Sequence, residues 1–306
     1  MTHTLRSSSV PPFWKTDTFR LLRLPFSVHL LPIYLFALSQ TPQIDLWRAL
    51  TVFVLLHLLV YPASNGYNSY QDRDETPIGG LEHPPLPTRQ LYNVTLMMDA
   101  AAVLLGLVLG WTFALMLLLY ILASRAYSYR GIRLKKYPVL GFLTVFVFQG
   151  AFTFLLSYQG ISGVAWSNIL SPAVLYAMLV SSCFIGGVYP LTQVYQHEAD
   201  RANGDQTLSL LLGFRGTFLF SGALFGLATV GLWLLFRTKE QFGAFWLFLL
   251  FMLPVVSYFT VWLVNVRRDV QQASFRNTMR MNQIAACCMI LYFLTLTLVY
   301  SPSFIF

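Results

Sequence analysis

The sequence predicts an all-α integral membrane protein whose helices surround a central cavity that opens to the cytoplasm. Its composition, its apolar runs and an internal repeat support this prediction. Of 306 residues, 56% are hydrophobic and only 10% are charged, whereas an ordinary soluble domain carries roughly 25% charged residues. Apolar runs of about 17 to 25 residues, long enough to cross a hydrocarbon core, recur along the chain. We expect about nine transmembrane helices, arranged as two related four-helix units plus one, in a single domain over residues 1–306.

Each predicted span follows from one apolar run, except that the third and fourth spans share a run too long for a single crossing. We divide this run at Gly110, because glycine weakens helices. The predicted spans are 24–40, 46–64, 93–109, 111–126, 138–157, 169–190, 217–236, 243–265 and 283–302.

Basic residues lie mostly on one side of this arrangement, and such an excess marks the cytoplasmic side. The N-terminal arm and the even-numbered loops hold 17 of the 20 Lys and Arg residues, which leaves Arg48, Arg237 and Lys239 on the other side. We therefore expect a cytoplasmic-membrane protein with its N-terminus in the cytoplasm and Phe306 outside. The net charge of +8 is divided among short stretches, which favours lipid headgroups or an anionic substrate over nucleic acid.

Acidic residues concentrate in the second and sixth loops, in two segments that align without a gap. In residues 61–73 and 189–201, Tyr-Pro, an amide, Tyr, another amide and then Asp-Arg recur at the same offsets. This repeat is the basis for the two four-helix units. At spacings of i, i+3 and i+7, each segment places two amides and one acid on one helical stripe. The two stripes are Asn65, Asn68 and Asp72, and Gln193, Gln196 and Asp200.

The two acidic stripes predict a site for a hard cation. Mg²⁺ binds a few carboxylates together with water and substrate phosphate oxygens, and acids next to a membrane are normally sparse. The candidate ligands are Asp72, Asp74, Glu198 and Asp200. Alternatively, these residues are ordinary solvated acids at helix ends.

The fourth loop supplies the complementary charge. It holds five cations within twelve residues, namely Arg125, Arg130, Arg133, Lys135 and Lys136. Such a cluster can bind an anionic group, and Arg suits bidentate contact with phosphate. Anchoring to lipid headgroups is the alternative interpretation.

Together these features resemble the UbiA superfamily of intramembrane prenyltransferases over nearly the whole chain. The resemblance is carried by Asn68 to Asp72, Tyr127-Ser128, Arg133-Leu134-Lys135, the Pro85-Leu86-Pro87 turn and the segment 200–208. It implies Mg²⁺-dependent transfer of a prenyl group from a polyprenyl diphosphate to an acceptor, aromatic or other, that no residue here identifies. It implies Asp72 and Asp200 as catalytic residues, and Tyr67 and Tyr195 as aromatic faces near the developing cation. The implied diphosphate contacts are Asn68, Arg73, Tyr127, Arg133, Lys135, Lys136, Gln196 and Arg201.

The chain departs from the family's motifs at several positions. The usual Asn-Asp-x-x-Asp-x-x-x-Asp is here Asn68-Ser69-x-x-Asp72-x-x-x-Thr76, and Gln196 replaces the Asp that stands four residues before the second acid. Pro84 stands where the family has Arg. Candidates for the missing ligands are the neighbouring acids Asp74, Glu75 and Glu198.

These departures leave a second function open, that of a non-catalytic homologue that binds an isoprenoid lipid or supports a partner protein. A transporter is disfavoured, because Asp99, His29 and His57 are the only acids and histidines within the predicted spans, too few for an evident relay.

Overall fold

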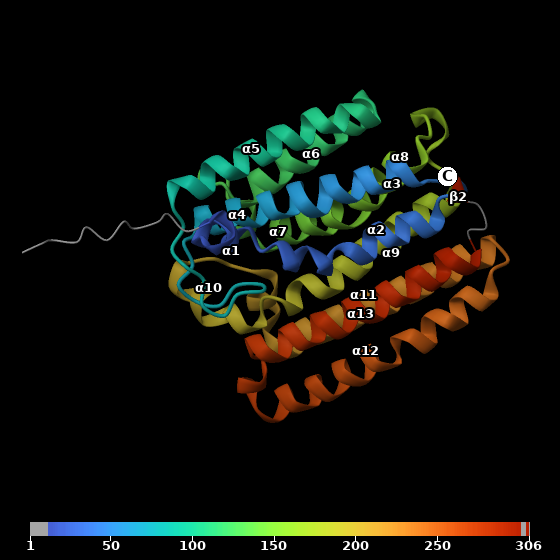
Figure 1. The fold of residues 1–306 in the computed structure, drawn as a ribbon. Coiled ribbons are helices and arrows are strands. Elements are labelled where there is room, and N and C mark those ends of the chain that lie inside the picture. Colours follow the sequence, from blue (N-terminus) through green and yellow to red (C-terminus); the bar gives the residue numbers. More distant parts are fainter. Residues whose placement is uncertain (1–11, 301–303, 306) are drawn as a thin grey trace, which may run out of the picture.

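The structure is a computed structural model that describes residues 12–300 and 304–305, and these residues form a bundle of helices aligned along one axis (Figure 1). The helices are α1 (Asp17–Leu22), α2 (Leu31–Gln40), α3 (Leu46–Phe53), α4 (Tyr61–Asp72), α5 (Arg89–Gly106), α6 (Trp111–Ser128), α7 (Pro138–Val145), α8 (Thr153–Ser162), α9 (Pro172–Leu191), α10 (His197–Asn203), α11 (Leu208–Thr238), α12 (Phe242–Arg268) and α13 (Phe275–Tyr300).

The number of long apolar helices confirms the prediction of about nine transmembrane spans. Within the described residues, eight helices are long and apolar enough to cross a membrane. A ninth span arises if Asp17–His29 and Leu31–Gln40, which are bent by 43° relative to each other, count as one. Two of the eight spans continue through π-helical segments: Val54–Val60 joins α3 to α4, and Phe146–Phe152 joins α7 to α8.

The division of the long apolar run at Gly110 is also confirmed. A 3₁₀ turn extends α5 to Leu109, and α6 begins at Trp111. Gly110 between them has a φ of 122°, a conformation that a residue with a side chain adopts only under strain.

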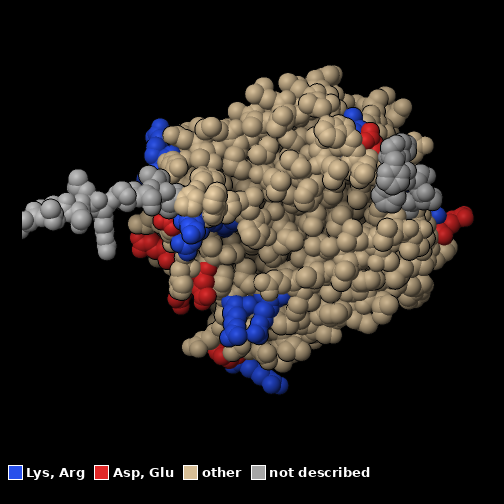
Figure 2. All heavy atoms as spheres, in the orientation of Figure 1, with Lys and Arg blue, Asp and Glu red and all other residues tan. Residues whose placement is uncertain are grey.

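Charged side chains gather at the two ends of the bundle, and an uncharged belt separates them on the face shown in Figure 2. Large apolar side chains on the outer surface are exposed, for example Leu104 at 67% and Leu298 at 72%. A soluble protein rarely exposes so much apolar surface, whereas a bilayer covers it. The chain is therefore a multi-pass membrane protein.

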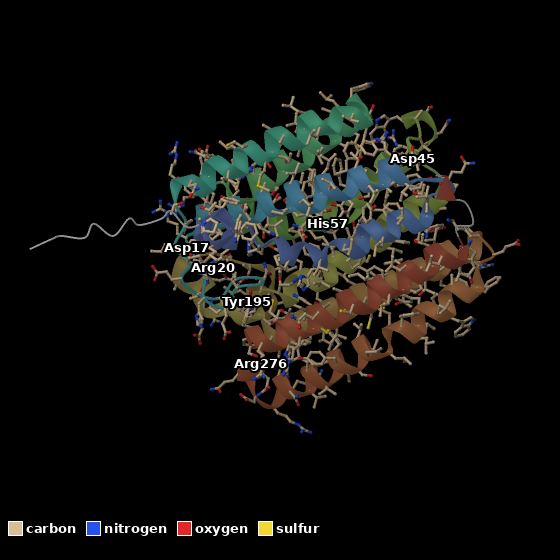
Figure 3. All side chains as sticks on the ribbon, in the orientation of Figure 1. Asp17, Arg20, Asp45, His57, Tyr195 and Arg276 are labelled. Carbon is tan, nitrogen blue, oxygen red and sulfur yellow. The ribbon has the colours of Figure 1, made fainter. Side chains whose placement is uncertain are left out.

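The two ends of the bundle differ in structure. At one end, β1 (Ile44–Asp45) pairs in parallel with β2 (Phe304–Ile305), so that Ile44 lies opposite Phe304 (Figure 1). The other end carries α10 and the segment 73–88. Figure 3 shows Asp45 toward the β2 end and Tyr195 toward the α10 end, with His57 between them.

Candidate active site

The described residues enclose a cavity of ≈ 1230 Å³ that begins at the α10 end and extends between the helices. Its volume exceeds the roughly 300–1,000 Å³ of a typical small-molecule pocket. Acids, amides and cations line one part, and the remainder is largely apolar. The apolar wall includes Phe225, Leu249, Met252, Val256, Phe259 and Met289.

The first acidic segment includes the whole of α4, which presents the predicted stripe to this cavity. Asn65, Asn68 and Asp72 all line the cavity. The helix ends at Asp72 because Arg73 takes a left-handed φ of 55°, and the Arg73 N–H donates to the Ser69 carbonyl. Asp72 thus stands on the last turn of a helix whose upstream part lies in the membrane. Ser69 is buried and is absent from the described cavity lining.

The second acidic segment reaches the same cavity, although not as the continuous helix that the i, i+3, i+7 spacing assumed. The chain leaves α9 at Leu191, passes a 3₁₀ turn at Val194–Gln196 and re-enters a helix as α10. Gln193, Gln196 and Asp200 nevertheless all line the cavity. Acids from the two repeated segments therefore share one cavity, as the repeat predicted.

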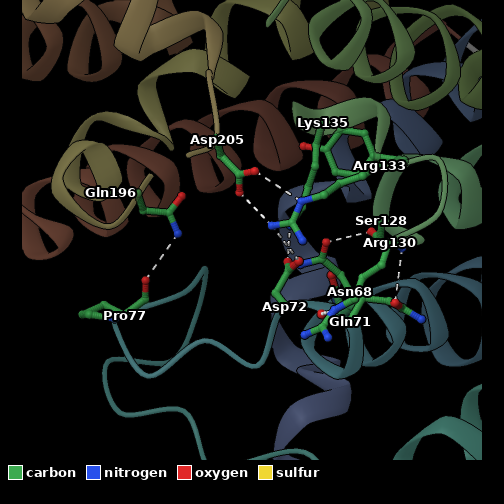
Figure 4. Close-up of polar contacts among 12 residues, drawn as sticks. Asn68, Gln71, Asp72, Pro77, Ser128, Arg130, Arg133, Lys135, Gln196 and Asp205 are labelled. Atoms are coloured by element: carbon green, nitrogen blue, oxygen red, sulfur yellow. Dashed lines mark hydrogen bonds and ion pairs between the residues drawn. The ribbon is translucent and has the colours of Figure 1, made fainter. Parts of the chain in front are cut away.

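Two cations from the segment between α6 and α7, Arg133 and Lys135, contact acids of the site (Figure 4). Lys135 forms an ion pair with Asp72 through Oδ2. The Arg133 guanidinium donates two hydrogen bonds to the Asp205 carboxylate, at 2.8 Å from Nη2 to Oδ2 and 3.2 Å from Nε to Oδ1. The Arg133 Nη2 atom also lies 3.8 Å from Asp72 Oδ1. Arg133 thereby links the end of α4 to the segment between α10 and α11.

Asp74 adds a further carboxylate beside Asp72. Burial, followed by the negative charge of Asp72, raises the pKa of Asp74 to about 6, while Lys135, Arg23 and Arg133 act in the opposite direction. The hydrogen bonds between Arg133 and Asp205 raise the pKa of Arg133. The local electrostatics are therefore those of acids crowded together and only partly neutralised by cations.

These acids fit a metal ion that is shared with a substrate, and they do not fit a closed protein cage. The side chain of Asp72 is only 5% exposed. Its Oδ1 atom is buried and yet has no hydrogen-bond partner in the described structure. A carboxylate oxygen that accepts no hydrogen bond, with Asp74 nearby, suits Mg²⁺, which takes one or two carboxylates and completes its shell with water and phosphate. Among the described residues, no three His, Cys, Asp or Glu side chains group closely enough to hold a metal alone.

Most of the predicted site residues lie on the cavity, and three do not. The lining includes Asn68, Asp72, Asp74, Tyr127, Arg133, Lys135, Lys136, Gln196 and Asp200. Glu198, Arg73 and Arg201 are exposed and stand outside the described lining. Arg201 follows the lining residue Asp200 on α10, and successive helical residues face different sides. Arg73 is the left-handed residue that ends α4.

The two aromatic candidates divide in the same way. Tyr195 lines the cavity, whereas the face of Tyr67 is covered by the Arg125 guanidinium at 3.9 Å from the ring centroid. Tyr127 also lines the cavity, and its hydroxyl hydrogen-bonds the Tyr189 hydroxyl at 2.8 Å. Tyr67 is therefore not positioned to face a reacting carbon.

Two polar residues of the cavity, Asp205 and Arg23, were not predicted as site residues, and Arg130 was predicted only as a member of the cationic fourth loop. Asp205 binds Arg133, Arg130 donates to the Gln71 carbonyl at 2.7 Å, and Arg23 donates to the carbonyls of Asn65 and Gly79. All three line the cavity. Arg130 belongs to the cationic fourth loop, and Asp205 to the segment 200–208 that carries the family resemblance. Arg23 comes from the N-terminal arm, and no motif connects it to the site.

The apolar part of the cavity reaches the outer surface of the bundle between α11 and α12. Gly226 on α11 and Leu253 and Val256 on α12 line the cavity and are also exposed, Leu253 and Val256 each at 59%. The cavity is thus continuous from the charged α10 end to a lipid-facing surface.

Comparison with known proteins gives one family. Residues 29–284 match the UbiA prenyltransferase family. No curated protein sequence matches the chain.

Several solved structures share the fold. A UbiA homologue from Archaeoglobus fulgidus, solved bound to DMAPP and Mg²⁺, superposes with a TM-score of 0.64 at 18% identity, over 93% of this chain and all of that one. An apo UbiA homologue from Aeropyrum pernix K1 gives a TM-score of 0.63 at 18% identity, over 90% of this chain and 98% of that one. A digeranylgeranylglyceryl phosphate synthase gives 0.59 at 16% identity, over 91% and 96%. At these identities the likeness concerns the fold alone.

Proposed function

The chain belongs to the UbiA prenyltransferase family, and we propose that it transfers a prenyl group from a polyprenyl diphosphate to a second substrate inside the membrane. The observation that supports this most is the cavity itself. Acids from two distant segments and cations from a third meet at one end of it, and apolar walls extend from there to the lipid. An amphiphile with an anionic head and a hydrocarbon tail matches both parts.

The donor diphosphate would lie at the α10 end. Asn68, Tyr127, Arg133, Lys135, Lys136 and Gln196 remain the candidates for contact with it, joined by Arg23 and Arg130, since all line the cavity. The prenyl tail would follow the apolar wall toward the opening between α11 and α12. Because that opening leads to lipid, the cavity sets no closed limit on the length of the tail.

The residues of the site would help to break the bond between C1 of the prenyl chain and the diphosphate oxygen. Arg133 and Lys135 would neutralise the charge that grows on the leaving diphosphate, and neutralisation of this kind is usually a large term in catalysis. The apolar wall would exclude water from the cationic carbon. The carbon then bonds to the acceptor, which loses a proton.

Asp72, Asp74 and Asp200 would hold Mg²⁺, in accordance with the Oδ1 of Asp72, which accepts no hydrogen bond, and with the Mg²⁺ in the Archaeoglobus fulgidus homologue. When bound, the ion supplies further positive charge to the leaving group. Glu198 is left out of this set because it is exposed and outside the described lining.

The alternative is an isoprenoid-binding protein without turnover. It is favoured by the substitutions at Ser69, Thr76 and Gln196, and by the ion pairs that already engage Asp72 and Asp205. Both functions use the same cavity for the isoprenoid chain, so product formation is what separates them.

The test is to incubate the purified protein with Mg²⁺, labelled prenyl diphosphates of increasing chain length and a membrane lipid extract. Enzyme function predicts labelled product that requires both the protein and Mg²⁺. Tight donor binding without any product across the series would favour the isoprenoid-binding alternative.

We also propose that the α10 end faces the cytoplasm, because 17 of the 20 Lys and Arg residues belong to that side of the nine-span arrangement. A reporter fused after residue 204 should register the cytoplasm, and a reporter fused after Phe306 the opposite side. If both report the same side, the nine-span topology is wrong.

A further inference from the structure

Two groups that a metal-bound diphosphate would need are bound to each other in this structure. Lys135 and Arg133 each form an ion pair with Asp72, and the Oδ1 of Asp72, which accepts no hydrogen bond, suits a metal. A divalent cation requires Asp72, while a diphosphate requires the two basic side chains. The ion pairs therefore compete with both ligands.

These contacts are built into the fold. The side chains of Asp72, Lys135 and Arg133 are 5%, 16% and 22% exposed. Arg133 adopts a left-handed φ of 48° immediately before the 3₁₀ turn Leu134–Lys136. The turn lies tightly against α7, because a Cβ added at Gly141 would meet the Lys135 Cα at 3.1 Å. The backbone at Lys135 therefore packs closely against α7, so an exchange of partners would involve the side chains of the two cations rather than their backbone.

Neither acid engaged by the cations depends on metal for its charge balance. Both oxygens of Asp205 accept from Arg133, and Asp72 Oδ2 accepts from Lys135. A divalent cation that approaches Asp72 thus meets a carboxylate that already has Lys135 as its counter-ion. Its affinity should be low, because removing a buried counter-ion is costly.

We propose that Lys135 and Arg133 act as exchangeable counter-ions, which leave Asp72 for the diphosphate and thereby make Asp72 available to the divalent cation. Diphosphate and metal then bind cooperatively, and each binds weakly without the other. This inference rests on the proposed function only in requiring a diphosphate ligand, not in requiring transfer.

The exchange predicts opposite changes in two affinities from one substitution. In Lys135→Gln, Asp72 loses its main counter-ion, so Mn²⁺ alone should bind about tenfold more tightly. Inorganic pyrophosphate without metal should bind about tenfold more weakly, because one of its cations is gone. A residue with a merely structural role would weaken both, and a simple phosphate contact would leave the affinity for Mn²⁺ alone unchanged.

The measurement uses the full-length protein in detergent. Free Mn²⁺ is followed by electron paramagnetic resonance and pyrophosphate by calorimetry, each alone and together. In the wild type, saturating pyrophosphate should tighten Mn²⁺ binding at least about fivefold, within the usual range of couplings between sites. Arg268→Gln, which removes a charge from an exposed position at the end of α12, is the matched control and should change neither affinity.

A second variant, Asp72→Asn, tests the exchange independently in case Lys135→Gln does not fold. Asp72→Asn releases Lys135, so pyrophosphate without metal should bind more tightly, and Mn²⁺ should no longer alter its binding. Equal weakening of both ligands in Lys135→Gln, or unchanged pyrophosphate affinity in Asp72→Asn, would overturn the exchange. Opposite shifts without any prenylated product would support the exchange and contradict the transferase.

Discussion

Replacement of Asp72 by Asn should lower prenyl transfer about a thousandfold while the protein still folds. The amide preserves the shape of the side chain but loses the charge that binds a metal. Loss of several kcal/mol of charge stabilisation, roughly 4 kcal/mol, corresponds to this factor. Lys135 keeps a neighbouring negative charge from Asp74, so the variant does not leave that ammonium group isolated. Turnover should be measured with saturating donor, so that weaker binding is not mistaken for slower transfer.

The control for this variant is Asp269→Asn, which changes an exposed acid that caps the turn after α12. It should keep wild-type turnover, because Asn also serves as a cap. If Asp72→Asn retained more than about a tenth of the wild-type rate, the charge of Asp72 would contribute little to the transition state, and the proposed site would be wrong.

The sequence was sufficient to predict the helices that are apolar throughout. The nine-span pattern and the interruption at Gly110 follow directly from hydropathy and from glycine's freedom at a φ of 122°. Helix ends were less predictable. α13 begins at Phe275, ahead of the predicted start at 283, because its first turns carry Arg276 and Arg280, which hydropathy does not distinguish from a loop.

The repeat identified two acids of the site, whereas the charged fourth loop and the family resemblance identified several of its cations. Asp72 and Asp200 were identified because the same residues recur at the same offsets, and both line the cavity. Asp205 and Arg23 lie outside the repeat, and their roles depend on how segments 42 to 72 residues apart meet. Such pairings are set by helix packing, which one sequence does not reveal. The sequence also placed Arg125 with the loop cations, whereas it lies inside α6.

Arg125 has a structural partner in the membrane. Its Nε donates to Asp99 Oδ2 on α5 at 2.8 Å, and its guanidinium covers the Tyr67 ring on α4 at 3.9 Å from the centroid. The side chains of Arg125 and Asp99 are 14% and 12% exposed. An ion pair at such a position holds α4, α5 and α6 together, and α4 carries Asn68 and Asp72.

Replacement of Arg125 by Met should destabilise the protein by about 3–5 kcal/mol, because it leaves the Asp99 carboxylate buried without a counter-ion. The double variant Arg125→Met with Asp99→Leu should recover most of that loss, since no unpaired charge remains. Unfolding free energies of the wild type, both single variants and the double variant in one detergent give the coupling between the two residues. Arg267→Met, at the exposed end of α12, should change stability by less than about 0.5 kcal/mol. If the double variant were as unstable as Arg125→Met, the loss would come from the contact with Tyr67 rather than from the ion pair, and α4 would depend on that stacking for its position.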